Sequence, residues 1–233
     1  FDGNWHGRTM GAQMMSGNKK QKEWIGYHDR NIHHLPFPYP WKLKGTSSEK
    51  FLEKSIKKLK IKVNLKKDIC GVMLETFQGW GAIYYPKKYI KNLEKICKEN
   101  DILIAFDEMQ SGFGRTGELF GYMHYEIEPD LLCCGKGASS GFPLALVLGS
   151  ADLLDIPEIG SMSSTHSANP VVCAAGKANL EALFEDNLIS NSKELGKLFH
   201  EELNKIAKLH KKYILGVYGK GLVAALIFKD NQG

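Results

Sequence analysis

The chain has 233 residues, of which 43% are hydrophobic and 24% are charged, and its formal net charge is +5. This composition is ordinary for one large globular domain, or one domain and part of a second, and it excludes low-complexity and collagen-like chains. The excess lysines are spread over several runs with few aromatic residues between them, which is more typical of solvated helix faces than of a nucleic-acid site.

No apolar stretch approaches the roughly 20 residues that a membrane-spanning helix needs. The five cysteines show no metal-type spacing, and no metal site is expected. Most of them lie in apolar runs, so we expect buried free thiols and a reducing, cytoplasmic compartment. The chain begins at Phe1 and ends in an apolar strand, which we interpret as a fragment of a longer protein.

The first elements are indicated by proline positions and apolar spacing. Prolines alternate with aromatic residues over 36–41, which predicts an extended, non-helical connection after residue 35. A helix is expected over 48–60, and a short apolar strand over 70–74 that ends at Glu75. Pro86 then stands where a helix typically begins.

The later elements alternate between apolar strands and amphipathic helices. They are expected in this order: strands over 102–106, 131–134 and 143–148, a helix from Asn169 to about Phe184, an amphipathic helix that includes 195–209, a turn-rich connector over 216–221 and a strand over 222–228. This alternation predicts an α/β fold with a mostly parallel sheet and helices on both faces. We place a large domain at 1–185 and the beginning of a small C-terminal domain at 186–233.

A lysine and an acid stand at the ends of two of the predicted strands. Asp107 ends the apolar run 102–106, and Lys136, flanked by glycines, follows the apolar run 131–134. Ligands bind at the strand ends of an open parallel sheet, so these groups could hold one cofactor from two sides. A partly desolvated lysine near another cation becomes a nucleophile. Pyridoxal phosphate enzymes require such a lysine together with an acid at the pyridine nitrogen.

These residues belong to a longer set of motifs that resembles the class III (omega-type) aminotransferases of pyridoxal phosphate fold type I. The motifs are Trp5-His6-Gly7-Arg8-Thr9, Glu75 with Gln78-Gly79, the stretch 104–117, Pro129-Asp130, Gly135-Lys136-Gly137, and Ser164-Thr165 before Asn169-Pro170. They follow the order expected for the family and cover nearly the whole chain. They are specific for the family and poorly specific for the substrate.

The resemblance implies a role for each matching position. Lys136 would form the Schiff base with the cofactor and move a proton at the substrate α-carbon, and Asp107 would keep the pyridine nitrogen protonated. Gln110 would lie near the phenolic oxygen, and Glu75 would be a further acid near the cofactor. Trp5 would stack on the ring, with its neighbour His6 as a weaker candidate. Even within the family, Trp5 could instead be a core aromatic.

The resemblance also implies a homodimer with shared active sites and no nucleic-acid or membrane partner. Thr165, with Ser164 beside it, would reach the cofactor phosphate of the other subunit. Arg8 resembles an arginine that binds a substrate carboxylate in some members, which its planar fork suits, although it could simply pair with an acid. The family's phosphate-binding loop would lie before Phe1 and its carboxylate-binding arginine after Gly233.

One departure bears on the substrate. Many members place a glutamate where this chain has Trp80, and that acid pairs with the C-terminal arginine when the enzyme alternates between two substrates. Trp80 cannot form this pair, so the two-substrate switching is in doubt and a more aromatic substrate pocket is expected.

The expected reaction is transamination between an omega-amine or amino acid and a 2-oxo acid or aldehyde. A racemase or epimerase, or a decarboxylase, would use the same lysine and acid. An ATPase is a remote alternative because Lys136 is not followed by the Ser or Thr of a phosphate loop. A non-catalytic homologue is a further alternative.

Overall fold

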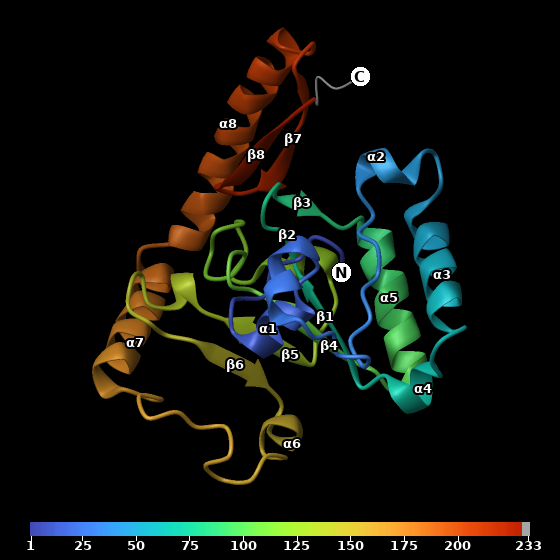
Figure 1. Ribbon diagram of the computed structural model, residues 1–233. Coiled ribbons are helices and arrows are strands. Elements are labelled where there is room, and N and C mark those ends of the chain that lie inside the picture. Colours follow the sequence, from blue (N-terminus) through green and yellow to red (C-terminus); the bar gives the residue numbers. More distant parts are fainter. Residues whose placement is uncertain (230–233) are drawn as a thin grey trace.

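The computed structural model describes residues 1–229, and Figure 1 shows the path of the chain. Its α-helices are α1 (Met10–Met15), α2 (Pro40–Leu43), α3 (Ser48–Leu59), α4 (Leu65–Asp68), α5 (Lys87–Asn100), α6 (Ala151–Leu154), α7 (Pro170–Glu185) and α8 (Leu188–Leu209). Its 3₁₀ helices are η1 (Lys20–Ile25), η2 (Gly121–Tyr125) and η3 (Lys136–Ala138). Its strands are β1 (Gly71–Glu75), β2 (Phe77–Gln78), β3 (Ile83–Tyr84), β4 (Leu103–Asp107), β5 (Leu131–Cys134), β6 (Leu146–Gly149), β7 (Ile214–Lys220) and β8 (Val223–Phe228).

The central element is a four-stranded sheet in the order β1-β4-β5-β6. β1, β4 and β5 are parallel, with Glu75 opposite Asp107 and Asp107 opposite Cys133. β6 runs antiparallel to β5. The connection 135–145 holds only η3, and a parallel return needs a crossover of about a dozen residues or more, usually an α-helix. The predicted α/β class with a mostly parallel sheet is therefore confirmed, with one reversed strand at its edge.

Helix α5 covers part of this sheet, and buried residues in two of the strands stand directly before the acids at the sheet edge. Tyr89, Ile90 and Leu93 on one face of α5 are buried, and α5 contacts β4 and lies beside α3 (Figure 1). In the strands, Leu74 and Phe106 are fully buried. The residue after each of them is an acid, so the core anchors both acids at the sheet edge.

Three of the expected elements differ from the structure. The connection expected to be non-helical over 36–41 is extended only as far as Tyr39, because α2 begins at Pro40. Residues 216–221 are not a connector, because most of them belong to β7, which pairs antiparallel with β8. A Cβ at Gly219 would lie 2.0 Å from the carbonyl oxygen of Val223, so this glycine permits close approach within the hairpin instead of breaking a strand. The strand expected over 143–148 begins only at Leu146.

The C-terminal elements leave apolar surface exposed. α8 is separated from α7 by a short break at Asp186 and Asn187, and Figure 1 shows α8, β7 and β8 standing above the four-stranded sheet. On α8, Leu198 and Leu209 remain 56% and 80% exposed. The domain boundary near residue 185 stays a prediction.

The expectation of buried thiols holds for only part of the set. Cys97 and Cys134 are buried and Cys133 is half-buried, whereas Cys70 and Cys173 are exposed. Cys70 precedes the first strand and Cys173 lies on the first turn of α7, so an apolar neighbourhood in sequence did not mean burial. Within residues 1–229, no helix combines the length and the apolar character needed to cross a membrane.

Candidate active site

The candidate site lies at the carboxyl edge of the parallel strands. Glu75 ends β1, Asp107 ends β4, and Lys136 follows β5 by two residues. Because β1, β4 and β5 are parallel neighbours, these three side chains leave the sheet at the same edge. The Asp130 side chain accepts a hydrogen bond from the Ile104 amide at 2.7 Å, which ties the start of β5 to β4.

Asp107 is buried and held from two sides. Its Oδ2 lies 2.8 Å from Nδ1 of His6, and its Oδ1 accepts from the Met109 amide at 3.0 Å. The His6 side chain is only 1% exposed, and among the described residues its Nε2 has no hydrogen-bond partner. A ring that donates from Nδ1 to a carboxylate has its tautomer and orientation set by that bond. His6 therefore positions Asp107 although 101 residues separate them in the chain.

Glu75 is a second buried acid beside Asp107. Burial raises its pKa to about 8, and the negative charge of Asp107 adds to that rise. Hydrogen bonds from the backbone amides of Trp5, at 3.0 Å, and Gly79 partly oppose the shift. Glu75 is therefore mostly uncharged at neutral pH, which avoids two adjacent buried negative charges.

Lys136 is exposed at this edge, so the partial desolvation expected from its neighbours is not observed. Gly135 before it and Ala138 after it are buried, so at this turn the Lys136 side chain points outward while the backbone stays against the core. Lys136 has a φ of 42°, a left-handed conformation that is uncommon for a residue other than glycine and that clusters at functional sites. A Cβ at Gly135 would lie 2.5 Å from the Met109 sulfur, so Gly135 lets this turn approach the loop after β4.

Trp5 and Arg8 form a pair of their own. Trp5 is half-buried, and the Arg8 guanidinium lies 4.9 Å from the centroid of its ring. This is a cation–π contact, and it occupies one face of the indole. Arg8 thus has an aromatic partner and not the acid considered from the sequence.

Gln110 reaches back toward Glu75 from the loop after β4. A Cβ at Gly79 would lie 2.2 Å from the Gln110 side-chain nitrogen and 3.0 Å from Oε1 of Glu75. The absence of a side chain at Gly79 therefore gives Gln110 its place beside the buried acid.

Sequence reasoning did not assign a role to Gln78, which is fully buried between two parts of the site. Its amide nitrogen donates to the Asp2 carbonyl at 2.7 Å and to Asn4 Oδ1 at 2.9 Å. Its amide oxygen accepts from Trp80 at 2.6 Å and from the Tyr39 hydroxyl. Gln78 thereby holds the segment before Trp5 and orients Trp80, which stays 58% exposed. In the sequence, only its place in a family motif could have identified Gln78 as part of the site.

Glu108 is another residue whose role the sequence left open. Its carboxylate is fully buried and accepts from the Thr76 hydroxyl at 2.5 Å and the Ser111 hydroxyl at 2.7 Å. It also accepts from the amides of Gly121 and Tyr122, both at 2.8 Å. Glu108 therefore closes the loop after β4 on itself and fixes the backbone that follows Asp107. In the sequence, the position of Glu108 directly after Asp107 is the one signal that could have identified it.

Ser164 and Thr165 lie apart from this arrangement, in the exposed loop between α6 and α7. The Ser164 hydroxyl contacts the Ser167 hydroxyl at 2.9 Å. Within the single chain, residues 1–229 show no hydrogen bond from Thr165 to Lys136 or Asp107.

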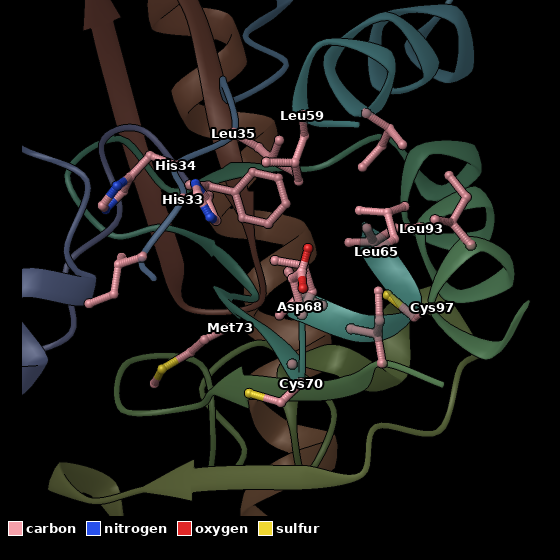
Figure 2. A pocket seen from close by; sticks show the side chains of 18 of the residues that line it. His33, His34, Leu35, Leu59, Leu65, Asp68, Cys70, Met73, Leu93 and Cys97 are labelled. Atoms are coloured by element: carbon pink, nitrogen blue, oxygen red, sulfur yellow. The ribbon is translucent and has the colours of Figure 1, made fainter. Parts of the chain in front are cut away.

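An apolar cavity of about 330 Å³ lies elsewhere, near the beginning of β1 (Figure 2). Figure 2 shows Leu35, Leu59 and Leu65 around it, with Cys70 where the strand starts. Because the acids stand at the opposite end of β1, this cavity is separate from the candidate active site.

Comparison with known proteins agrees with this geometry. The family model "Aminotransferase class-III" matches residues 1–233. The acetylornithine aminotransferase of Caldanaerobacter subterraneus is 34% identical over 221 residues, which are 94% of this chain and 51% of that protein. An alanine/serine racemase of Pyrococcus horikoshii is 33% identical over 244 residues, covering 99% of this chain and 51% of the racemase.

Among solved structures, an (S)-enantioselective omega-transaminase from Thermomicrobium roseum superimposes with a TM-score of 0.85 at 29% identity, over 97% of this chain and 52% of that one. The chain thus spans about half the length of the curated relatives it matches. Since the family match extends over all 233 residues, the chain belongs to the class-III aminotransferase family.

Proposed function

We propose that the protein transfers an amino group between an omega-amine or amino acid and a 2-oxo acid or aldehyde, with pyridoxal phosphate as cofactor. The observation that carries the proposal is the exposed Lys136 at the same sheet edge as Asp107, whose carboxylate is oriented by His6. In the net reaction the donor gives up its amino group and one carbon-bound hydrogen and takes the carbonyl oxygen of the acceptor, so no external oxidant is needed.

The residues present fit the cofactor that this family uses. Asp107 keeps lone pairs beyond its bonds to His6 and Met109, so it can accept a further N–H. Lys136 offers an exposed amine, and Trp5 keeps one ring face clear of Arg8. When bound, pyridoxal phosphate supplies an electron sink for the bonding electrons of the substrate carbon.

Each of the remaining roles is proposed for a different side chain. Lys136 would hold the cofactor and move a proton at the substrate α-carbon, and Asp107 would keep a proton on the pyridine nitrogen. Gln110, beside Glu75, would donate toward the phenolic oxygen. Trp5 would cover one face of the ring, and His6 would keep the Asp107 carboxylate in place.

The proposed substrate class is based on Trp80 and its aromatic neighbour Tyr39. Trp80 stands 5.8 Å from Tyr39 between ring centroids, and it cannot form an ion pair with an arginine. This supports an aromatic pocket over alternate binding of two charged substrates. Arg8 would bind a substrate carboxylate while stacked on Trp5, since a guanidinium can donate in its plane with an aromatic ring on its face.

A second candidate is amino-acid racemisation, because one relative is an alanine/serine racemase. A racemase would use the same lysine and acid. The two reactions differ in whether the amino group leaves the substrate carbon. Incubation in heavy water distinguishes the two: incorporation of deuterium at the substrate α-carbon without formation of an oxo acid would favour the racemase.

Replacement of Lys136 tests the proposal directly. In the Lys136→Ala protein we expect amino-group transfer to fall by at least about a thousandfold, because the nucleophilic amine is lost. Borohydride reduction of the unaltered protein with pyridoxal phosphate should label the peptide that contains Lys136, as read by mass spectrometry. Lys177→Ala, on α7, is the control and should retain both activity and label. A label on another lysine in the Lys136→Ala protein would refute the assignment.

A further inference from the structure

A second concave surface carries an unusual set of charges. It is a hollow of about 940 Å³ between residues 32–36, the end of α2 and one face of α3. Six lysines line it, and we call it the basic hollow: Lys19, Lys42, Lys44, Lys54, Lys58 and Lys62. Residues 32–35 line both this hollow and the apolar cavity of Figure 2, where His33 and His34 are labelled, so they form the wall between the two.

The lysines of the basic hollow are not neutralised by acids. Asp2 is the one acidic residue among the lining residues. None of the six lysines forms an ion pair within the described part of the chain. Lysines on α5 and α8, by contrast, pair with glutamates three or four residues away, as Lys98 does with Glu94 at 2.8 Å.

This arrangement is unfavourable without a ligand. Lys54 and Lys58 are four residues apart on α3, and like charges at that spacing repel each other on a helix surface. Lys62 adds a third charge from the turn after the helix. A concave surface lined by one sign of charge concentrates the opposite ion.

The other side of the same helix shows that this is a local feature. Lys57 and Lys60 line a different hollow together with Lys95 and two acids, Glu53 and Glu99. The excess of lysines over acids is therefore one on this side of α3 and five in the basic hollow, although both sides carry exposed lysines.

We propose that the basic hollow binds a small anion that carries two or more phosphate groups. Ammonium groups on flexible stems suit phosphate approached from several directions, and arginine, which favours planar carboxylate recognition, is absent from the lining residues. His33 and the hydroxyl of Thr46 add further polar groups. A single-stranded nucleic acid would call for several large aromatic platforms, and Phe51 is the one Phe, Tyr or Trp in the lining.

Calorimetric titration of the intact protein with inorganic triphosphate tests the proposal. We expect saturable binding with one site per chain that weakens as salt increases. The Lys54→Ala/Lys58→Ala variant should raise the Kd by roughly tenfold, because it removes two of the converging charges. The matched Lys57→Ala/Lys60→Ala variant loses the same net charge from α3 and its C-cap and should change the Kd by less than about twofold. Circular dichroism of both variants checks that α3 remains folded.

Three results would overturn the proposal. The first is no saturable binding up to about 1 mM triphosphate. The second is an equal loss of affinity in the two variants, which would show a diffuse charge effect. The third is binding of a single-stranded RNA in the same assay without binding of triphosphate, which would assign the hollow to nucleic acid instead.

Discussion

At the scale of single residues, the site depends on two buried acids in different environments. Asp107 is positioned by His6, whereas Glu75 is kept largely uncharged by burial and by its neighbour. One carboxylate can then serve a cationic ring nitrogen without a second negative charge beside it. The difference arises from environment, since both acids end neighbouring parallel strands in the same register.

The raised pKa of Glu75 predicts a pH-dependent stability. In the unfolded chain Glu75 loses its proton near pH 4.5, but in the folded chain it keeps the proton until about pH 8. Its contribution is therefore complete below pH 4.5, falls as pH rises and is lost above about pH 8, with an upper limit of about 5 kcal/mol. Thermal unfolding of the cofactor-free protein across this window should show the decline.

Glu75→Gln should flatten this decline, because the amide does not titrate. Glu53→Gln, on the exposed side of α3, is the control and should follow the unaltered protein. Parallel stability curves for the unaltered protein and Glu75→Gln between pH 5 and pH 8 would contradict the raised pKa.

At the scale of elements, caps and loops determine where the functional residues stand. The four hydrogen bonds of Glu108 fold the loop after β4 back onto η2. Helix α7 begins at Pro170, and the Asn169 side chain accepts from the amides of Val171 at 3.0 Å and Val172 at 3.3 Å. This cap ends the loop that carries Thr165.

Asn169→Ala should therefore destabilise the protein by about 1 kcal/mol, because two amides at the helix start lose their acceptor. For a chain of this size that corresponds to a fall of about 2–4 °C in Tm, measured by circular dichroism. Asn169→Asp keeps an acceptor and should stay close to the unaltered protein. Equal melting temperatures for Asn169→Ala and the unaltered protein would exclude a role for the cap.

At the scale of the whole molecule, one chain does not account for all of its predicted site residues. Thr165 lies in an exposed loop with Ile159 and Met162, whose side chains are almost fully exposed, and Val147 on β6 is more than half exposed. Exposed apolar surface of this kind is typical of an interface. It supports the proposed homodimer, in which Thr165 would complete the site of the other subunit.

Mixed dimers test that arrangement. If Thr165 acts in the partner's site, Lys136→Ala and Thr165→Ala subunits refolded together should regain activity, because each mixed dimer then holds one intact site. With random pairing, about a quarter of the unaltered activity is expected. If Thr165 acts in its own subunit, every site keeps one defect and mixing restores nothing. Size-exclusion chromatography with light scattering confirms that dimers have formed.

Several features were predictable because they depend on local pattern. Apolar runs marked β4 and β5, and the helical spacing of Tyr89, Ile90 and Leu93 marked α5. The error at 216–221 has a local cause too: glycines are common in turns, but in β7 Gly219 allows the β8 backbone to come close. The exposure of Lys136 was missed because neighbouring residues do not report how the sheet edge meets solvent.

By itself, the sequence determined the α/β class, the lysine and acid at strand ends, and the motifs that place the chain in its family. The tertiary structure decided which groups lie together: His6 on Asp107, Gln78 between the segment before Trp5 and Trp80, and the six lysines of the basic hollow. The physical reason is that the spacing of hydrophobic residues, which predicts helices and strands, depends on neighbours in the chain. Contacts and pKa values depend instead on strand register and on how the fold brings together residues that are far apart in sequence.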